Sequence, residues 1–580
     1  MRKERDAMDI HSCHRSKPAV LVQLVLILSW LTHIQMTDTY FYVCALIACG
    51  GIFCTCENYR HDLPRSRGTW IRVLLFSAVF SLSAILGNYS LFEPFTSLTN
   101  LFRMALSFLG GLSLGGNVLA YLLWVFPGLQ AAEEKRDHPG RVFALSFGVI
   151  ALIDLVFLLL VEWPGVLTRD SMDQIRQIIT GKYSNANPYW HTVTVGIFVK
   201  LGLLVTGDLH WGVALFSIFQ ILYLAGCFSY AVMTLYQKGA PRWCLWAVWA
   251  GYALIPYQIV YSVTVWKDIL FSGASLLLTV ALYRLLYPVE KEEKRDWILF
   301  VLGGAGLCLW RTNGLLVIAM LLMALALAER KNKKLAAVLA VILVIGLVLC
   351  GPVLSLMGIR GAGLAETLSI PLQQVARVCY DGAAIAQEDL DLIRTVAEPE
   401  EFAGVYQSYL SDPVKGLLRR SAGYEQLKAD PLPYLKLWLR MGLRHPISYL
   451  KAWIDQTKGY WNAGYSYWIT AEGIYENEFG LVSRPGNIVG TVFDKLMRYA
   501  ELMPLMHPLF SIGLDTWLTA VCCFVNRQRR RPEWLLSLPW LVILFGLLIG
   551  TPVYAEFRYA YPVMLACPLI LTATFLKTKE

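Results

Sequence analysis

Four short segments of the sequence place charged side chains directly beside long apolar runs. A charged group is costly at the edge of a membrane, so each of these groups is a candidate for function. The segments are TRDSMDQ, with Asp170 and Asp173; VWKDILF, with Lys267 and Asp268; WRTNG, with Arg311; and AEFRYAYP, with Glu556, Arg558 and Tyr559. His191 follows the first segment, in NPYWHT.

The acidic side chains and the histidine are suited to moving protons. A carboxylate or an imidazole can act as a general base, and the candidates for that role are Asp170, Asp173, His191 and Asp268. Because Asp170 and Asp173 are three residues apart, a helix would present both on one face. Asp170 is also a residue type that caps helix N-termini, which is the alternative interpretation. Two carboxylates are typical ligands of a divalent cation, so Asp170 and Asp268 are candidate ligands of Mg²⁺ or Mn²⁺.

The basic side chains are suited to holding an anion at the membrane surface. Lys267, Arg311 and Arg558 would together bind a phosphate, which arginine contacts through two parallel hydrogen bonds. Glu556 and Tyr559 flank Arg558 and complete the candidate substrate-binding set. The alternative interpretation is that Lys267 closes a turn with the acid that follows it, and that Arg558 anchors a helix at the interface. A base next to a phosphate site favours chemistry on a lipid-linked phosphate.

The composition of the chain indicates the kind of structure that must position these groups. The 580 residues are 56% hydrophobic and 16% charged, and the mean hydropathy is +0.50. Soluble domains are about 45–50% apolar and about 25% charged, which excludes an ordinary soluble enzyme and a disordered chain. The net charge of +9 lies in short loops between apolar runs, so no nucleic-acid partner is expected. The sequence predicts an α-helical polytopic membrane protein surrounded by membrane lipids.

Fourteen apolar runs are long enough to suggest membrane-spanning helices, since a bilayer core takes about 20 residues per helix. The positions of lysine and arginine between them place both chain termini in the cytoplasm, by the positive-inside rule. This orientation requires that 191–207, which carries Lys200, is a re-entrant or surface-lying helix. The expected spans are 18–36, 40–56, 70–88, 100–126, 142–162, 211–236, 243–263, 269–287, 297–311, 314–328, 335–355, 506–525, 534–551 and 560–576.

This topology divides the chain into four parts and brings the charged segments to one face of the membrane. The expected parts are 1–141, a basic tail with four spans; 142–355, a membrane core with an outer loop at 163–210; 356–505, a polar segment outside the membrane; and 506–580, the C-terminal spans. The outer face then receives the loop 163–210, the turns at 264–268 and 311–314, the polar segment, and the turn at 551–560.

The polar segment is expected to be mostly helical. Its stretch 459–479 is dense in tyrosine and tryptophan, which either stack on the sugar rings of an acceptor or rest on the membrane interface. Gln373, Gln374 and Arg377 recur at helical spacing and either line a cleft or form bonds within the segment.

Several of these segments resemble a known superfamily of membrane enzymes. The resemblance is to the GT-C-type glycosyltransferases, which include the protein O-mannosyltransferases and the aminoarabinose transferases, and more closely to the bacterial DUF6020-like proteins. It covers about two thirds of the chain and rests on PGVLTRDSMDQ, NPYWHT, VWKDILF, RTNGL, IPLQQVARV, HPISYLKAWIDQTKGYW and EFRYAYP.

The resemblance implies a GT-C fold and the transfer of a sugar from a polyprenyl-phosphate donor, usually with inversion, outside the cytoplasmic membrane. It implies that Asp170 is the base that deprotonates the acceptor hydroxyl and that Asp268 is the acid of a second outer loop. Arg558 and Tyr559 match an Arg-Tyr pair late in the membrane domain. The sequence departs from the mannosyltransferases at 169–171, where it has Arg-Asp-Ser in place of their Asp-Glu pair, and in its four additional N-terminal spans.

Three functions are therefore compared. The favoured one is a glycosyltransferase that moves a sugar from a polyprenyl-phosphate carrier to a cell-surface glycan or lipid acceptor. The alternative is a flippase or exporter of a lipid-linked saccharide, although transporters usually place ionisable groups near the membrane midplane and the charges here gather at one face. The third is a non-catalytic membrane scaffold whose outer segment binds glycan.

Overall fold

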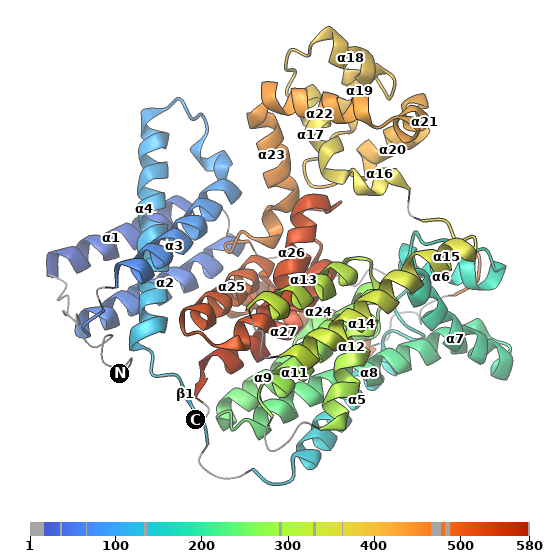
Figure 1. Ribbon diagram of the computed structural model, residues 1–580, viewed down its shortest axis with the longest axis horizontal. Helices are drawn as coiled ribbons and strands as arrows, with labels where there is room; N and C mark the ends of the chain where they lie inside the picture. The colour runs from blue at the N-terminus through green and yellow to red at the C-terminus, as the bar shows by residue number, and fades with distance from the viewer. Residues whose placement is uncertain are drawn as a thin grey trace.

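The computed structural model is built almost entirely of helices (Figure 1). It describes residues 17–34, 38–64, 66–132, 136–288, 293–328, 332–361, 363–465, 477–481 and 488–577. The N-terminal tail expected before the first span lies outside the described residues, as does 466–476 of the aromatic stretch.

Ten helices in the described residues are long and apolar enough to cross a membrane, and two further pairs of helices each form a bent span if counted as one. The bends measure 50° between α9 (Arg242–Leu254) and α10 (Pro256–Ser262), and 64° between the 3₁₀ helix Pro504–Phe510 and α25 (Ile512–Gln528). These ten to twelve helices confirm a helical, multi-pass membrane protein. The straight candidates are Lys17–Ile34 (α1), Phe41–Arg60 (most of α2, Asp38–Arg60), Arg67–Gly87 (α3), Leu98–Val125 (α4, Leu98–Ala120, with the π-helical turn Tyr121–Val125), Pro139–Leu160 (α5), Tyr189–Thr206 (α7), Leu209–Gln237 (α8), Lys267–Leu286 (α11), Lys333–Leu356 (α14, Lys333–Cys350, with α15, Pro352–Leu356) and Pro532–Gly550 (the 3₁₀ helix Pro532–Ser537 with α26, Leu538–Gly550).

The count differs from the fourteen expected spans at three places. The expected spans 297–311, 314–328 and 560–576 correspond to α12 (Lys294–Trp310), α13 (Asn313–Ala328) and α27 (Phe557–Phe575), which are shorter or less apolar than the others. Conversely, α7 is one continuous helix of 18 residues where a re-entrant or surface helix was expected. Its surface placement stays a prediction.

The N-terminal helices α1 to α4 form a separate bundle beside the membrane core, at the left of Figure 1. Trp517 of α25 packs edge-on against Phe76 and Phe80 of α3, with ring centroids 5.6 and 5.1 Å away. After α3, the Tyr89 hydroxyl donates a hydrogen bond of 2.9 Å to Asp455. The additional N-terminal spans therefore contact both the C-terminal spans and the base of the segment outside the membrane core.

Helix α11 lies at the centre of the membrane core. Nearly all of its residues from Asp268 to Leu285 are buried, and α8, α12 and α27 pack against it. The approach of α12 is close: a Cβ added to Gly303 would lie 2.7 Å from the backbone nitrogen of Leu278. A helix enclosed in this way has a fixed position, so the residues at its N-terminus are fixed as well.

The two strands are short and mark the opposite end of the core from the N-terminus of α27. Strand β1 (Leu129–Gln130), in the connection from α4 to α5, pairs in parallel with β2 (Leu576–Lys577), directly after α27. The α4–α5 connection and the C-terminal end of the described chain therefore lie together.

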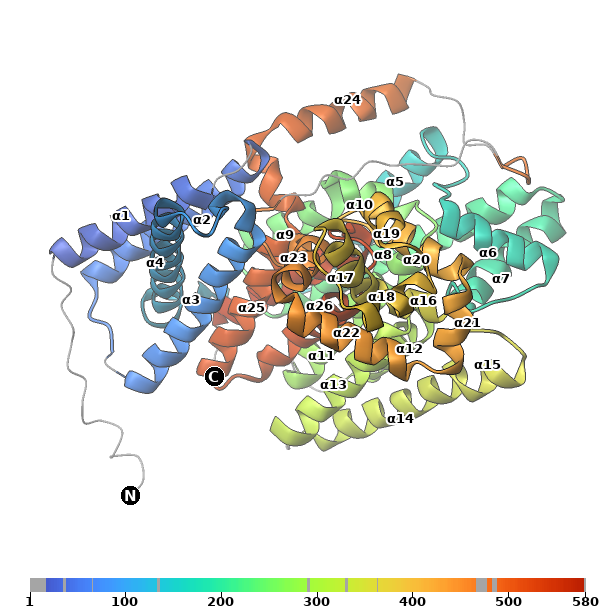
Figure 2. The same ribbon diagram turned by 90° about the horizontal axis from the view of Figure 1, so that it is seen from above.

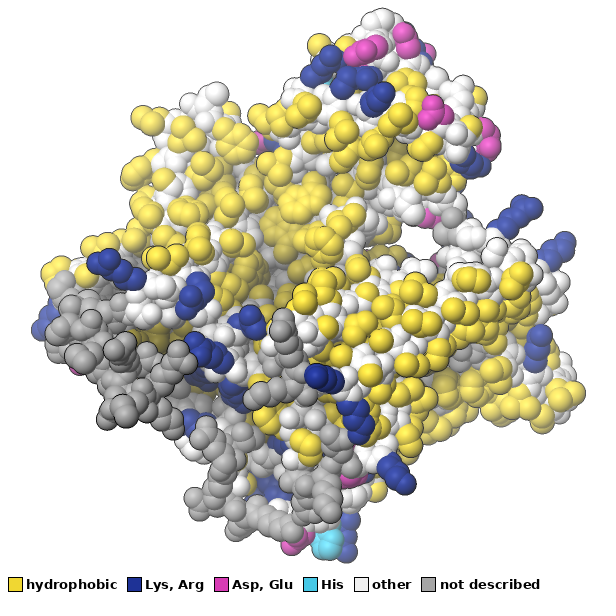
Figure 3. All heavy atoms as spheres, in the orientation of Figure 1, with side chains coloured by type: hydrophobic (Ala, Val, Ile, Leu, Met, Phe, Trp, Pro, Cys, Tyr) yellow, Lys and Arg dark blue, Asp and Glu magenta, His cyan; other side chains and the backbone are white. Residues whose placement is uncertain are grey.

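Eight helices form a domain beyond the membrane core, at the top of Figure 1. Figure 3 shows acidic and basic side chains gathered on this domain, whereas hydrophobic side chains cover much of the membrane helices. The three polar residues noted in the sequence bond within or at the base of the domain: Gln373 to the Gln407 carbonyl, Gln374 to the Tyr449 carbonyl, and Arg377 to the Asp381 and Asp455 carboxylates. The helices are α16 (Leu364–Thr367), α17 (Ser369–Tyr380), α18 (Gln387–Arg394), α19 (Pro399–Val405), α20 (Asp412–Arg420), α21 (Ala422–Ala429), α22 (Leu432–Arg444) and α23 (Pro446–Thr457).

Two remaining elements connect this domain to the C-terminal spans. A 3₁₀ turn, Lys458–Tyr460, follows α23, and helix α24 (Ile488–Leu502) precedes the bent span. Figure 2 shows that α24 crosses one side of the molecule, apart from the other helices over most of its length. Its Phe493 contacts Phe157 of α5 at a centroid distance of 4.6 Å.

The close approach of α12 to α11 predicts that a methyl group added at Gly303 lowers the stability of the protein, whereas one added at a glycine with open space around it does not. Gly303→Ala forces the two helices apart, and we expect it to lower the free energy of unfolding by about 1–3 kcal/mol, the usual cost of overpacking. Gly148→Ala in α5 is the matched control, because nothing lies within 4 Å of a Cβ added there. Thermal unfolding of both variants in nanodiscs measures the difference; equal Tm values would contradict the close packing.

Candidate functional site

The backbones of two connecting segments are joined directly to each other next to the start of α6 (Arg169–Thr180) and α11. The Val166 amide donates to the Val263 carbonyl at 2.9 Å, and the Val265 amide donates to the Val166 carbonyl at 3.0 Å. Gly165 makes this approach possible, with a φ of +142° and with Ser217 Oγ only 2.4 Å from where a Cβ would stand. The bridge fixes the start of α6 relative to the start of α11.

Two polar side chains of α8 donate hydrogen bonds to backbone carbonyls of these segments. The fully buried Gln220 side chain donates to the carbonyls of Tyr261, Ser262 and Thr264, at 3.2, 3.0 and 2.8 Å. Ser217 Oγ donates to the Pro164 carbonyl at 3.0 Å. The sequence analysis identified neither residue. For Gln220 a signal was available, because a glutamine inside a largely apolar helix needs hydrogen-bond partners.

Asp170 lies in the first turn of α6 and does not cap it. The N-cap is Thr168, whose side chain forms a reciprocal capping box with Ser171. Ser171 Oγ also donates to the Val265 carbonyl at 2.7 Å, and the Trp266 indole donates to Thr168 Oγ1. The capping interpretation of Asp170 is therefore wrong, and its carboxylate is left available for other partners.

Asp170 is the meeting point of three segments that are distant in the sequence. Its Oδ2 atom accepts a hydrogen bond of 3.0 Å from Lys267 Nζ and another of 3.0 Å from Arg558 Nη1. Lys267 Nζ also donates to Asn187 Oδ1 at 2.6 Å, so the turn before α7 contacts the cluster as well. The structure thus brings together the loop that follows α5, the start of α11 and the start of α27, as the sequence predicted.

Arg558 is held in place by an acid and by two aromatic rings. Its Nε lies 3.3 Å from Glu556 Oε1, and its guanidinium lies over the rings of Trp266 and Tyr559, at 4.8 and 5.1 Å from their centroids. The segment before α27 is fixed by Tyr460, whose hydroxyl accepts from the Glu556 amide at 3.0 Å and donates to the Val553 carbonyl at 2.9 Å. Tyr460 is a third positioning residue; the sequence analysis noted the aromatic stretch 459–479 that contains it but did not assign it this role.

Arg311 and Asp268 form a separate buried ion pair next to this cluster. Arg311 Nη1 lies 2.6 Å from Asp268 Oδ1, and the Asp268 side chain is 0% exposed. The Arg311 guanidinium lies 4.6 Å from the Tyr559 ring centroid, so Tyr559 contacts both arginines. Asp268 is enclosed, and its geometry suits holding Arg311 in position.

The cluster has as many acidic as basic side chains, but its acids differ in solvent exposure and in the direction of their pKa shifts. The Asp170 side chain is 34% exposed, against 16% for Lys267 and 18% for Arg558. Burial alone would raise the pKa of Asp170, but Lys267 and Arg558 outweigh it and hold the pKa below its ordinary value. Burial raises the pKa of Glu556 above its ordinary value, although Arg558 acts in the opposite direction. Asp170 is therefore the accessible, ionised carboxylate of the cluster.

Two of the candidate catalytic residues make their contacts with side chains outside this cluster. Asp173 pairs with Arg176 at 2.8 Å on the exposed side of α6, and Arg176 pairs with Glu478 at 2.7 Å. His191 is fully buried between α6 and α7, where its Nδ1 lies 2.9 Å from Gln174 Nε2. These contacts give Asp173 a surface ion pair and His191 a packing contact between helices.

The acids of the cluster do not offer a ready set of metal ligands. Each of the two predicted ligands, Asp170 and Asp268, faces a cationic side chain. Within the described ranges, no group of three or more His, Cys, Asp or Glu side chains lies close enough to hold a metal ion. The residues present therefore do not fit the Mg²⁺ or Mn²⁺ site that was expected here.

Fold and site together define a multi-pass helical membrane protein with a partly buried, charge-balanced cluster where α6, α11 and α27 begin. The chain belongs to the DUF6020 family, a family of unknown function, whose sequence profile matches residues 180–580. The matched region contains Lys267, Asp268, Arg311 and Arg558 and begins at the last residue of α6, so Asp170 precedes it. Comparisons with curated proteins and with solved structures found no match.

The buried pair of Arg311 and Asp268 predicts a large loss of stability when one partner is removed. Arg311→Met leaves Asp268 without its cation, and we expect this to lower the free energy of unfolding by about 3–5 kcal/mol. Asp173→Ala breaks an exposed pair and should cost at most about 1 kcal/mol. Thermal unfolding measures both.

A double variant distinguishes the ion pair from simple packing. Asp268→Leu combined with Arg311→Met removes both charges and should recover most of the Tm lost in Arg311→Met alone. A double variant that is less stable than Arg311→Met would contradict the assignment.

Proposed function

We propose that this protein transfers a sugar from a polyprenyl-phosphate-linked donor to a hydroxyl group of a cell-surface glycan or lipid, at the outer face of the cytoplasmic membrane. The observation that carries the proposal is that Lys267 and Arg558 share one oxygen of Asp170. This arrangement supports a site that binds a phosphate through two cations and accepts a proton on the neighbouring carboxylate.

The donor phosphate binds to Lys267, Arg558 and Arg311. Their side chains are 16, 18 and 13% exposed, so water screens their charges less than at an open surface. Without substrate, Asp170 is the anionic partner of Lys267 and Arg558. An incoming phosphate replaces Asp170 as that partner and leaves the carboxylate free for the acceptor.

Asp170 is the base of the reaction. The acceptor oxygen attacks the anomeric carbon of the sugar while the bond from that carbon to the phosphate oxygen breaks. The electron pair of that bond leaves with the polyprenyl phosphate, and the hydroxyl proton of the acceptor passes to the Asp170 carboxylate. Lys267 and Arg558 compensate the charge that develops on the leaving phosphate. The reaction uses side chains of the cluster alone.

The proposal includes the GT-C arrangement that the sequence resemblance implies. In that arrangement α12, α13 and α27 also span the membrane and α7 lies at its surface, which gives fourteen spans and two cytoplasmic termini. The course of α27 supports this orientation. It begins beside the charged cluster at Arg558 and ends at β2, which pairs with the α4–α5 connection.

The role of Asp170 predicts that one substitution abolishes turnover without unfolding the protein. Purified wild type in nanodiscs should consume a sugar donor from a panel of polyprenyl-phosphate sugars, and Asp170→Asn should be slower by a factor of about 100 or more. Asp173→Asn, three residues away in an exposed pair, is the matched control and should keep wild-type activity. Chelator and added Mg²⁺ or Mn²⁺ test the ion expected from the sequence, and we expect neither to change the rate.

Equal rates for Asp170→Asn and wild type would contradict the proposal. Movement of a lipid-linked saccharide across liposomes without any acceptor, with no donor consumed, would support the flippase alternative instead.

The cations around Asp170 predict a shift of the pH profile in a defined direction. Asp170 acts as a base only when ionised, and Lys267 helps to hold its pKa below the ordinary value. Lys267→Gln removes one cation, so the pKa of Asp170 rises and the acid limb of kcat/KM moves to higher pH. Profiles of wild type and variant from pH 3 to pH 8, in about half-unit steps, measure this. A limb that stays in place or moves to lower pH would contradict Asp170 as the base.

A further inference from the structure

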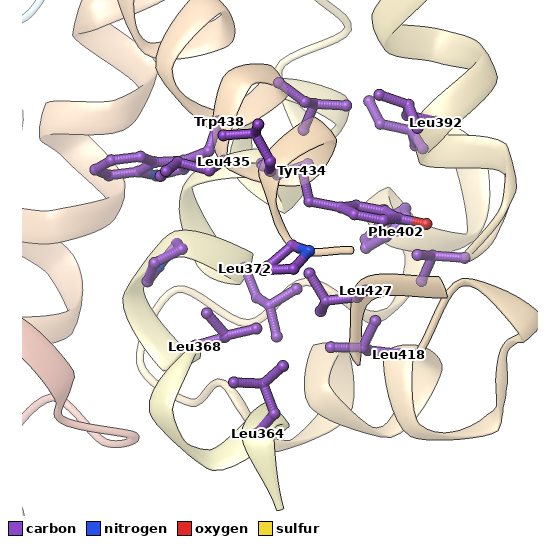
Figure 4. Close-up of a pocket in the computed structure, with 17 residues that line it drawn as sticks. Leu364, Leu368, Leu372, Leu392, Phe402, Leu418, Leu427, Tyr434, Leu435 and Trp438 are labelled. Carbon is purple, nitrogen blue, oxygen red and sulfur yellow. The ribbon is translucent and has the colours of Figure 1, made fainter. Parts of the chain in front are cut away.

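The domain outside the membrane core contains a partly open cavity of about 410 Å³ between its helices. Figure 4 shows leucine, phenylalanine, tyrosine and tryptophan side chains pointing into it from several helices, among them Leu372, Phe402 and Leu427. The volume falls in the range of roughly 300–1,000 Å³ that is typical of ligand pockets.

The side chains that line the cavity are almost entirely apolar. Its two polar-tipped side chains direct their polar atoms to partners in the protein: the Tyr434 hydroxyl bonds to Thr395 Oγ1 at 2.9 Å, and the Trp438 indole donates to Gln374 Oε1 at 2.8 Å. A ligand with hydroxyl, amide or charged groups inside the cavity would lose its hydrogen bonds to water without replacement. The chemistry of the cavity therefore fits a hydrocarbon chain.

The cavity opens toward a row of exposed leucines. Leu432 and Leu435 line it and are 53 and 51% exposed, and the row continues along the same face of α22 with Leu439 and Leu443, at 50 and 84%. Exposed apolar rows of this kind mark surfaces that contact lipid or a partner.

The cavity is also close to the membrane along the chain. Leu364 lines it and lies only eight positions after Leu356, the last residue of the α14–α15 span. Eight extended residues reach at most about 28 Å, so the cavity lies within this distance of a membrane-spanning helix. The hydrocarbon chains available at that distance are those of the surrounding lipids.

We propose that this cavity binds one acyl chain of a membrane phospholipid, with the exposed leucines of α22 as the path by which the chain enters. This site is separate from the charged cluster, and the inference does not depend on the proposed sugar transfer. It assigns to the domain a lipid-binding role that the transferase reaction does not require.

A photoreactive phospholipid tests the site in the full-length protein. The protein is reconstituted in nanodiscs that contain a phospholipid with a diazirine in its acyl chain, irradiated, digested and mapped by mass spectrometry. We expect labelled peptides from 364–438 in addition to those of the membrane helices. Leu372→Trp fills the cavity and should reduce labelling of 364–438 by about tenfold, while labelling of the membrane helices is unchanged. Leu450→Trp in α23 is the matched control, since Leu450 is 47% exposed, does not line the cavity and is not part of the leucine row on α22.

Two results would overturn the proposal. One is wild-type protein labelled only in its membrane helices. The other is equal labelling of 364–438 in wild type and in Leu372→Trp, with unfolding temperatures that show both are folded. If Leu372→Trp does not fold, Leu427→Phe fills the same cavity with a smaller change and is judged by the same criterion. Labelling of 364–438 by a diazirine polyprenyl phosphate, and not by the phospholipid, would also reject it.

Discussion

The geometry of the site depends on one carboxylate that holds two cations from distant parts of the chain. Lys267 and Arg558 are separated by almost three hundred residues, yet both contact the same oxygen of Asp170. Two cations at this distance repel each other, so they stay together only while an anion lies between them. The anion is Asp170 in the free protein, and in the proposed reaction it is the phosphate of the donor. This exchange of partners links binding of the donor to release of the base.

The membrane core supplies the rigidity that such a cluster requires. Helix α11 is enclosed by its neighbours and carries Lys267 at its first position, while α27 packs against α11 and carries Arg558 near its start. The short segments directly before α11 and α27 are not helical, and buried side chains hold them in place. Gln220 holds the carbonyls before α11, and Tyr460 holds the turn before α27. These hydrogen bonds from buried side chains determine where the charges of the cluster lie.

The sequence predicted the membrane class and the convergence of the charged segments, because both depend on regularities of composition and topology. Charged residues at the ends of apolar runs must leave the hydrocarbon, and helices that cross a membrane bring their ends to one of two faces. The pairing inside the cluster was not predictable in this way. Asp173 shares a helix turn with Asp170 but points to Arg176, and His191 is buried, because packing of α6 against α7 decides which side of each helix faces the site. The supporting roles of Gln220 and Tyr460 depend on contacts between segments far apart in the sequence, which residue patterns do not encode.

The central claim is that Lys267 and Arg558 exchange Asp170 for a phosphate. A structure by electron cryomicroscopy of the protein in nanodiscs, with polyprenyl phosphate bound, tests it directly. The account predicts the phosphate within hydrogen-bond distance of Lys267 Nζ and of the Arg558 guanidinium, with Asp170 displaced from both cations and open to an acceptor. A phosphate bound elsewhere, with both ion pairs of Asp170 intact, would contradict it.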